Sequence, residues 1–216
     1  MFDKDSLALF ADAKRLTDAQ IIKRWVTHLA RSVPELGDDE LVDVVSGWGV
    51  CRLPARSYWL KAGQSQTQMG VLVAGLGKLE YQDEQGGVVN VQFIQEGECV
   101  IEHRAFFDGE PCKYSMQTIE PSVILTIDQT HYHDCCQRYP FFYRHINEHL
   151  MQVLTQNADR IDNLLISDAQ ARYVKFIQEN PTLAARLSVS DLSSYLRMSR
   201  QMLTHIRKKL GHRKGD

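Results

Sequence analysis

The chain has no run of apolar residues that is long enough to cross a bilayer. Its most apolar stretch covers only residues 69–77, whereas a transmembrane helix needs about 20 consecutive apolar residues. The first residues, MFDKDSLALFADAKR, also lack the apolar segment that a secretory signal peptide contains. We therefore expect a cytoplasmic protein without a membrane partner.

The chain also lacks paired cysteines. Its cysteines are odd in number and include no C-x-x-C pair, which favours a reducing compartment over a disulfide framework. The run THYHDCC at 130–136 is rich in imidazole and thiol groups, but adjacent cysteines do not match the usual spacings of zinc ligands. We expect no metal site, and whether the cysteines sense redox state stays open. The five are Cys51, Cys99, Cys112, Cys135 and Cys136.

Acidic residues are missing from the segment 197–214, which carries seven lysines and arginines. The whole chain has 25 basic and 27 acidic residues, so the remainder has 18 basic residues against 27 acidic ones, a formal charge of -9. A cationic patch on an anionic body is typical of a protein that meets a polyanion at one place. The alternative explanation of the basic segment is a solvent-exposed C-terminal helix that binds no polyanion.

Helical and strand periodicities alternate along the chain and predict an α+β fold. A capping-box pattern at Thr17 and Gln20 precedes apolar residues at helical spacing, and a second helix is expected over 38–46. Between residues 50 and 127, short β-rich runs alternate with turn signals, as in a sandwich or barrel. Strands are expected at 58–60, 70–74, 78–81, 88–94, 114–119 and 123–127, with a hairpin turn at 83–87.

Residues 141–166 contain neither glycine nor proline and predict one helix of about 39 Å. Its apolar residues follow the alternating spacing of a heptad seam that includes one polar position. We expect this seam to form a homodimer interface, since twofold dimers are the commonest soluble oligomers; packing on the chain's own β domain is the alternative. The seam residues are Ile146, Leu150, Val153, Asn157, Ile161 and Leu164.

Residues 190–210, which include most of this basic segment, fit a helix-turn-helix. Ser190 is expected to cap a short helix with an apolar face, Arg197 and Met198 to form the turn, and Ser199 to cap a second helix. On that second helix the inward residues are expected to be Met202, Leu203, Ile206 and Leu210. Two short helices, the second with a basic outer face, match the arrangement that reads DNA.

The outward residues of the second helix carry the chemistry of base and phosphate recognition. Arg200 can donate two hydrogen bonds to guanine and Gln201 can pair with adenine, while Thr204 or His205 can add a base or sugar contact. Phosphate contacts set affinity but not sequence preference. They are assigned to Ser199, Arg207, Lys208, Lys209, Arg213 and Lys214.

The order of these parts resembles the Crp/Fnr family of bacterial transcription regulators, over roughly residues 36–212. The similarity is carried by LKAGQ at 60–64, by the run from Gly77 to Gly86, by RYVKFIQENP at 172–181 and by SDLSSYLRMSRQMLTHIRKKL at 190–210. It implies N-terminal helices and a cyclic-nucleotide-binding-like double-stranded β-helix (a β-roll or jelly roll) over residues 1–138. A dimerisation helix over 139–166 and a helix-turn-helix DNA-binding domain over 167–216 would follow.

The resemblance further implies a homodimeric, sequence-specific regulator of transcription that is not an enzyme. Its partners would be palindromic double-stranded DNA and a second copy of the chain, with RNA polymerase as a further candidate. Arg200, Gln201 and His205 fall where family members read the major groove. Arg197 stands where the family usually has glycine, which predicts a left-handed arginine at a cost of about 1 kcal/mol, and no β-wing is expected after the reading helix.

Family members that bind cyclic AMP hold its phosphate with an arginine that this chain lacks at the matching place. The matching runs are Ile101-Glu102-His103 and Cys112-Lys113-Tyr114. Glu102 is kept, and Lys113 replaces a bidentate, permanently charged clamp only in part. We expect no cofactor and a degenerate pocket that binds either no ligand or a small-molecule effector other than cyclic AMP, with Glu102 and Lys113 as the candidate contacts.

Two other function classes remain open at this point. The first is a cupin-like metal-dependent β-barrel enzyme, whose strands would give a similar sequence pattern. His131-x-His133 resembles part of the metal-ligand set of such enzymes, but Cys136 and Gln137 stand where their glutamate ligand is expected. A ligand-sensing module that has lost DNA binding is the other, and the presence of Arg200 and Gln201 argues against it.

Overall fold

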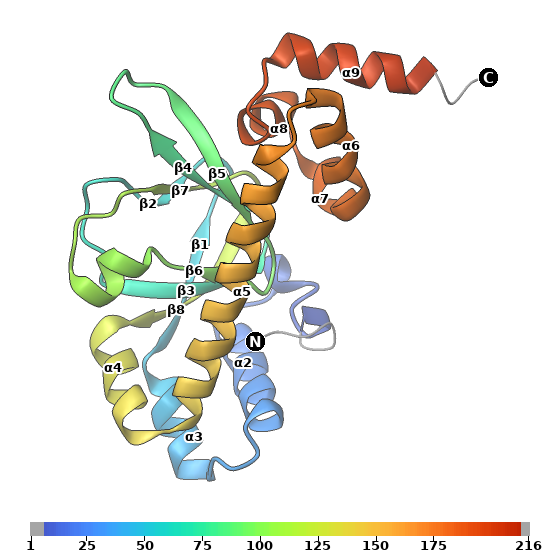
Figure 1. Cartoon of the computed structure of the whole chain (residues 1–216). Helices are drawn as coiled ribbons and strands as arrows, with labels where there is room; N and C mark the ends of the chain where they lie inside the picture. Colours follow the sequence, from blue (N-terminus) through green and yellow to red (C-terminus); the bar gives the residue numbers. More distant parts are fainter. Residues whose placement is uncertain (1–6, 213–216) are drawn as a thin grey trace. The chain divides into compact units, whose positions relative to one another are not determined.

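The computed structural model describes residues 7–212, without the side chains of His145, Ile146, His149, Gln152 and His212. Helices flank and follow a β-rich middle, so the expected α+β fold is confirmed (Figure 1). The chain divides into two compact units. One comprises residues up to Tyr81 together with Gln92–Leu150, and the other comprises Gln82–Val91 together with residues from Met151 onward. The domain limits 1–138, 139–166 and 167–216 stay a prediction.

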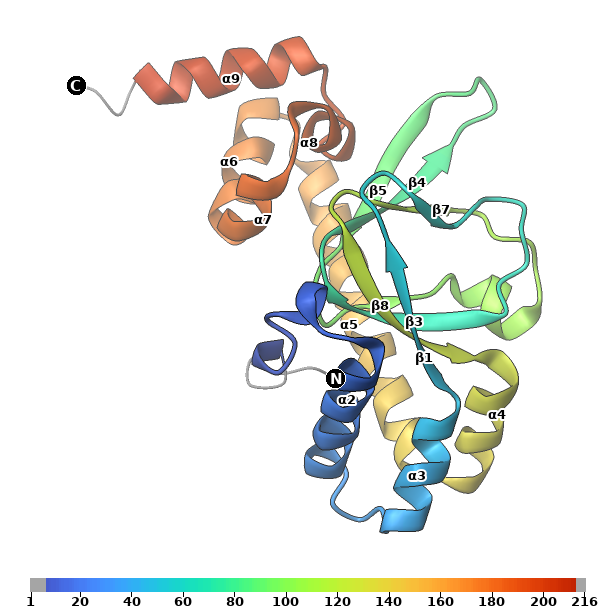
Figure 2. The same ribbon diagram turned by 180° about the vertical axis from the view of Figure 1, so that it is seen from behind.

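The N-terminal helices are η1 (Ala13–Arg15), α2 (Asp18–Ser32) and α3 (Asp38–Ser46). The capping box that starts α2 is formed as predicted: Gln20 N donates to Thr17 Oγ1 at 3.3 Å, and Thr17 N donates to Gln20 Oε1 at 2.8 Å. One face of α2 is buried through Ile21, Trp25 and Leu29. In Figures 1 and 2, α2 and α3 lie beside α4 (Gln129–Arg138) at one end of the strands.

Within residues 7–212, eight strands form two four-stranded sheets with the orders β1-β8-β3-β6 and β2-β7-β4-β5. The pairings of β8 with β1 and β3, of β3 with β6, and of β7 with β2 and β4 are antiparallel, which gives the predicted β-roll. Alternate residues point into the roll. The strands are β1 (Trp48–Leu53), β2 (Tyr58–Leu60), β3 (Gln68–Ala74), β4 (Gly77–Gln82), β5 (Val88–Ile94), β6 (Cys99–Val100), β7 (Ser115–Thr118) and β8 (Ser122–Asp128).

Both sheets contribute apolar side chains to the interior of the roll. Leu60, Ile94 and Met116 from one sheet pack with Leu72 and Ile124 from the other. The hairpin turn at 83–87 forms as expected, with Asp83 N donating to Gly87 O at 2.9 Å. Strands β1 and β6 were not predicted. Two glycines beside Trp48 weaken the strand pattern of β1, and β6 has only two residues.

The helix η2 (Arg104–Asp108) interrupts the roll between β6 and β7, and α4 joins β8 to the long helix α5 (Phe141–Leu165). The predicted continuous helix after Pro140 is thus confirmed, ending one residue earlier than expected. Four further helices follow: α6 (Ala169–Glu179), α7 (Pro181–Arg186), α8 (Val189–Tyr195) and α9 (Arg200–His212). In the part of the chain that the structure describes, no helix is both long and apolar enough to span a membrane.

Candidate nucleic-acid interface

Helices α8 and α9 are joined by the predicted tight turn. Arg197 has φ 54°, so it adopts the left-handed conformation expected where an arginine replaces glycine. Met198 N donates to Ser193 O at 3.0 Å, and Ser199 Oγ accepts from Met202 N at 3.1 Å, which caps α9. The α8–turn–α9 motif predicted from the sequence is therefore present.

The cap of α8 differs from the prediction. Ser188, not Ser190, is the N-cap residue: its Oγ accepts from Asp191 N at 3.0 Å, and it also donates to Asp191 Oδ2 at 2.5 Å. The acidic residue three positions later fits Ser188 and not Ser190, because a capping side chain bonds the N2 or N3 amide. Helix α8 accordingly begins at Val189.

The inner face of the pair is apolar. Leu192 of α8, Leu196 directly after it and Leu203 of α9 are fully buried, and Ile206 is nearly so. Met202 was expected to face inward, but 46% of its side chain is exposed. Successive helical residues are about 100° apart, so Met202 lies at the edge of the stripe that Leu203 and Ile206 define.

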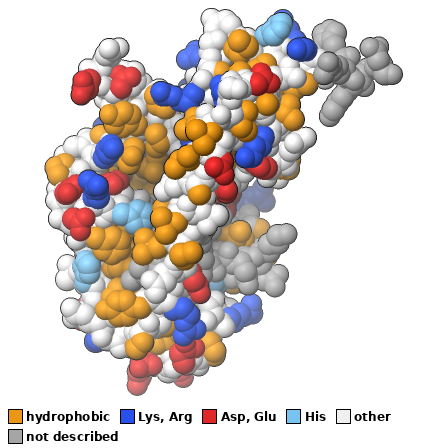
Figure 3. Space-filling view, viewed as in Figure 1, with side chains coloured by type: hydrophobic (Ala, Val, Ile, Leu, Met, Phe, Trp, Pro, Cys, Tyr) orange, Lys and Arg blue, Asp and Glu red, His pale blue; other side chains and the backbone are white. Residues whose placement is uncertain are grey.

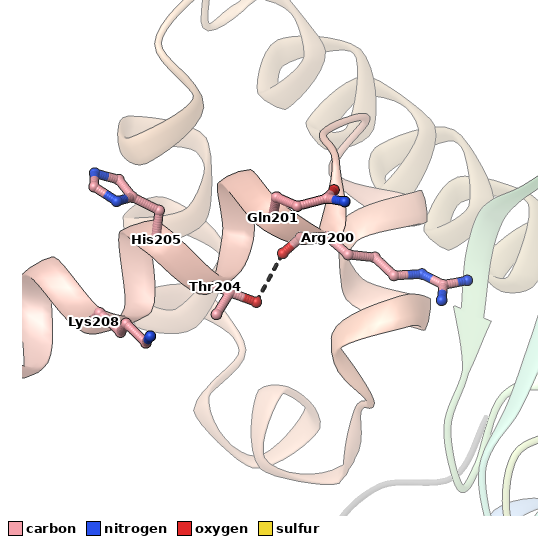
Figure 4. Close-up of a pocket in the computed structure, with 5 residues that line it drawn as sticks. All are labelled: Arg200, Gln201, Thr204, His205 and Lys208. Carbon is pink, nitrogen blue, oxygen red and sulfur yellow. Dashed lines mark hydrogen bonds between the residues drawn. The ribbon is translucent and has the colours of Figure 1, made fainter.

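The outer face of α9 gathers the residues predicted to read bases. Arg200, Gln201, Thr204, His205 and Lys208 line one open hollow of about 400 Å³ (Figure 4). All five are exposed, and they come from three successive turns of the helix. Thr204 Oγ1 donates to Arg200 O at 2.8 Å, so its hydroxyl hydrogen is used within the helix. The long hydrogen-bond donors Arg200 and Gln201 in the first turn and Lys208 further along the helix thus lie on one surface.

The predicted phosphate contacts divide into two groups. Ser199, Lys208 and Lys209 are exposed. Arg207 is half-buried, and its guanidinium lies over the Tyr173 ring of α6, 5.8 Å from the ring centre. Arg207 Nε is buried and has no hydrogen-bond partner among the described residues. Arg213 and Lys214 lie outside the residues that the structure describes.

An apolar stripe is exposed along α5 (Figure 3). Of the predicted seam, Leu150, Ile161 and Leu164 are 39%, 58% and 43% exposed. Asn157 is exposed, Val153 is half-buried, and the side chain of Ile146 lies outside the described residues. Three further apolar residues of α5 were not predicted, and they are more exposed than Leu150, Ile161 and Leu164: Met151, Leu154 and Leu165. The alternating four-three spacing that starts at Leu150 passes through Leu154, not Val153, on its way to Asn157, Ile161 and Leu164.

The two candidate effector contacts have separate surroundings. Glu102 is 8% exposed; its Oε2 accepts from Ala105 N at 3.1 Å, and its own amide donates to Gln66 Oε1 at 2.9 Å. The carboxylate thus bonds the start of η2. Lys113 is exposed, with Nζ 5.7 Å and 5.5 Å from the ring centres of Tyr81 and Tyr114. The structure does not place the two charges against one another.

The segment 130–136 lies on α4 and packs against α3. His131 Nε2 is 3.1 Å from Val44 O and 3.4 Å from Cys135 Sγ. Burial raises the pKa of the Cys135 thiol to about 11 and that of Cys99 to about 12. Among the described residues, no group of three or more histidine, cysteine or acidic side chains could hold a metal ion.

Comparison with known proteins connects both units to one class of fold. Residues 50–139 match the family model of the cyclic nucleotide-binding domain. No curated protein matches the chain. Among solved structures, it is similar to the c-di-GMP responsive global regulator CLP of Xanthomonas campestris, with 16% identity and a TM-score of 0.68 over 80% of this chain and 90% of that one.

Two further solved structures are also similar in fold. FixK2 of Bradyrhizobium japonicum has 14% identity and a TM-score of 0.68 over 78% of this chain and 86% of that one. A CRP/FNR family transcriptional regulator of Thermus thermophilus has 16% identity and a TM-score of 0.63 over 76% and 86%. The similarity extends beyond the β-roll, since more than three quarters of the chain is covered in each case. The resemblance seen in the sequence is therefore confirmed at the level of the fold.

Proposed function

We propose that this chain, which contains a cyclic nucleotide-binding domain and has the fold of the Crp/Fnr-type regulators, is a homodimeric, sequence-specific DNA-binding regulator of transcription. The observation that carries the proposal is the outer face of α9. Arg200, Gln201 and His205 are exposed together there, behind a tight turn and on an apolar base that holds the helix in place. We assign the chain no catalytic activity and a cytoplasmic location.

Base recognition is proposed for the first two turns of α9. An arginine guanidinium can donate two parallel hydrogen bonds to guanine O6 and N7, and a glutamine amide can pair with adenine N6 and N7. Arg200 and Gln201 stand next to each other at the start of the helix, which is the part of a reading helix that reaches base edges. His205 and Thr204, one turn further on, would contact the following base pair or its sugar.

Phosphate contacts are proposed for Ser199, Lys208 and Lys209, which are exposed on the same helix. Because these contacts release counterions from the DNA, they would give affinity and salt dependence without sequence preference. Arg207 is proposed as a weaker phosphate contact, because its guanidinium is partly held by Tyr173.

Self-association is proposed along α5. Leu150, Leu154, Ile161 and Leu164 expose apolar surface on one side of the helix, with Asn157 among them. A twofold axis beside this stripe would bury it against the same stripe of a second copy. Two α9 helices would then lie about 34 Å apart and read a palindrome whose half-sites are one helical turn apart. RNA polymerase is a further proposed partner, on the strength of the fold alone.

We infer that cyclic AMP is not bound in the manner usual for this domain. The matching run 112–114 contains no arginine, its Lys113 is exposed beside two tyrosines, and Glu102 is used to bond η2. Leu60, Ile94, Met116 and their neighbours fill the interior of the roll with apolar side chains. An effector, if the chain responds to one, would be chemically different from a cyclic mononucleotide. No observation favours the metalloenzyme alternative, since His131 is bonded within the α3–α4 contact.

Selection of bound sites from a random DNA library tests the proposed function. The purified full chain is expected to enrich a palindrome. Each half-site should contain one fixed guanine, read by Arg200, and one fixed adenine, read by Gln201. A matched variant that changes Arg200 and Gln201 to alanine should enrich no such motif under the same conditions. Equal enrichment by both proteins, or a motif without twofold symmetry, would contradict the proposal.

A further inference from the structure

The end of the β4–β5 hairpin, residues Gln82–Val91 (hereafter the hairpin end), belongs to the same compact unit as the helix-turn-helix. It carries Asn90 near the middle of β5, and Asn90 is only 2% exposed. An asparagine amide is buried at little cost only where its donors and acceptor find partners. The hydrogen-bond partners of Asn90 therefore show which element the hairpin end contacts.

Asn90 gives three hydrogen bonds to α8. Its backbone N donates to Ser194 Oγ at 2.9 Å. Its side-chain Nδ2 donates to Asp191 O at 3.0 Å and lies 3.4 Å from Asp191 Oδ1. Asp191 and Ser194 are three residues apart and so share one face of the helix. Asp191 Oδ2 in turn accepts from the N-cap residue Ser188, so the hairpin end joins the hydrogen-bond network that starts α8.

Two arginines hold α8 from other elements of the same unit. Arg172 on α6 donates to Leu196 O at 3.2 Å and to Ile166 O at 2.7 Å, which ties the end of α8 to the segment between α5 and α6. The Arg160 guanidinium on α5 stacks on Tyr195, 3.8 Å from the ring centre. Helix α8 is thus fixed along its length, by the hairpin end on one face and by α5 and α6 at its C-terminal end.

The direction of α9 is set by α8, because only the short turn at Arg197 separates the two helices and their apolar faces pack together. A residue that holds α8 to other elements therefore acts on where α9 points and not on the bases that α9 reads. In a dimer joined through α5, a small rotation of α8 would change the distance between two reading helices without changing either reading surface.

We propose that Asn90 is a positioning residue for DNA recognition, and that the hairpin end is a clamp that sets the placement of α9 through α8. The inference rests on the proposed function. It assigns to the β4–β5 hairpin a role in setting the distance between the two reading helices of a dimer, and so the separation of the half-sites that they bind. Arg160 and Arg172 hold α8 from the helical side, and Asn90 is the matching contact from a β-strand.

The test compares Asn90→Ala with Gln85→Ala in the full chain. Gln85 lies at the turn of the same hairpin, is exposed, and has no contact with α8 among its described hydrogen bonds. Affinity is measured by fluorescence anisotropy for an isolated half-site and for the full palindrome, each at several salt concentrations. The full palindrome is also measured with one to three base pairs added between the half-sites.

For Asn90→Ala we expect unchanged half-site affinity, a loss of about tenfold on the palindrome, and a flattened preference for half-site separation, because the gain from simultaneous engagement depends on geometry. Asn90→Asp should lose more, since its carboxylate would face the carbonyl and carboxylate of Asp191. Gln85→Ala should match the unchanged protein. Ser194→Ala removes the acceptor of the Asn90 amide without altering the hairpin, and it should show the same pattern if Asn90→Ala does not fold.

Two results would overturn the inference. In one, Asn90→Ala and Ser194→Ala bind all sites as the unchanged protein does. In the other, both lose half-site and palindrome affinity equally, as a purely structural role would require. Failure of the proposed function looks different, because the unchanged protein would then show no preference for the palindrome over other DNA.

Discussion

At the scale of single residues, we expect some side chains of α9 to select the DNA sequence and others only to add affinity. Arg200 and Lys208 line the same hollow on α9, but a guanidinium can form two bonds to guanine, whereas an ammonium is a point charge suited to phosphate. The two positions should therefore respond differently to truncation.

Arg200→Ala is expected to lose about 1–3 kcal/mol on the preferred site and to relax the choice of base at one position in each half-site. Lys208→Ala should weaken binding to all sequences alike and reduce the slope of log affinity against log salt by about 1 per site. Lys23→Ala, an exposed lysine on α2, serves as the control. Titration of the selected palindrome and its single-base variants measures both effects. Equal losses from the two variants on every sequence would count against this division of roles.

Cys99 and Cys135 should react slowly with alkylating reagents in the folded protein. Burial raises the pKa of the Cys99 thiol to about 12 and that of Cys135 to about 11, so at pH 8 only about one Cys135 thiol in a thousand is a thiolate. Iodoacetamide at pH 8 should leave both unmodified in the native chain. All five cysteines should be alkylated after unfolding in urea, as peptide mass spectrometry can follow. Native alkylation of Cys99 or Cys135 at the unfolded rate would instead support a redox-sensing role.

Residue-level expectations held where local chemistry decides the outcome. A left-handed residue was expected at Arg197, because the turn needs one whatever its side chain, and Ser199 caps α9. The cap of α8 was misplaced by two residues because Ser188 and Ser190 are both suitable caps, and only the bond to the Asp191 amide distinguishes them. The use of Glu102 to bond η2 could not be read from the sequence, since it depends on a π-helical turn that has no strong sequence signature.

At the scale of elements, the contact between α3 and α4 depends on a residue without a side chain. A Cβ atom at Gly47 would overlap the His131 ring, whose Nε2 is 3.1 Å from Val44 O. Gly47→Ala should therefore destabilise the fold by about 1–3 kcal/mol, as overpacking does. Gly211→Ala is the control: its added Cβ meets no atom within 4 Å, and it lies in a helix, where alanine is favoured. The urea concentration at the midpoint of unfolding is measured for the unchanged chain and for both variants. An unchanged midpoint for Gly47→Ala would contradict the packing argument.

The stripe along α5 should mediate self-association. Ile161→Asp places a carboxylate on exposed apolar surface, where a homodimer would have to bury it unpaired at a cost of several kcal/mol. Thr155→Asp adds the same charge to the same helix about 100° or more from the stripe and is the control. Sedimentation equilibrium should show a dimer for the unchanged chain and for Thr155→Asp, and a monomer for Ile161→Asp. A monomer for the unchanged chain, or a stable dimer for Ile161→Asp, would refute the proposed interface.

Long, strongly periodic elements were predictable and short or glycine-containing ones were not. Helices α2, α5 and α9 carry their own apolar faces, and α2 and α9 also have N-terminal caps, so the sequence indicates them directly. Strand β1 owes its place to pairing with β8 at the register Gly49–Thr126, a long-range contact that no local pattern reports. The heptad along α5 was assigned with Val153 in place of Leu154, because both positions are apolar and only the folded chain shows which is exposed.

At the scale of the whole molecule, the charge distribution and the fold favour the same partner. The formal net charge of the chain is -2, and the segment 197–214 alone carries seven basic residues and no acid. DNA would therefore be attracted to the surface that carries α9 and repelled elsewhere, which supports docking in one orientation. Sequence composition predicts a polyanionic partner, and the spacing of the site would follow from the proposed twofold dimer.

The dependence of affinity on half-site separation tests the central proposal most directly. Fluorescence anisotropy is measured on the selected palindrome and on versions with one to ten base pairs inserted at its centre. Two α9 helices related by a twofold axis predict highest affinity with half-sites about 10 base pairs apart, a sharp loss when about five are inserted, and only partial recovery at about ten. An affinity that is the same for every separation, or for one half-site and two, would contradict the account.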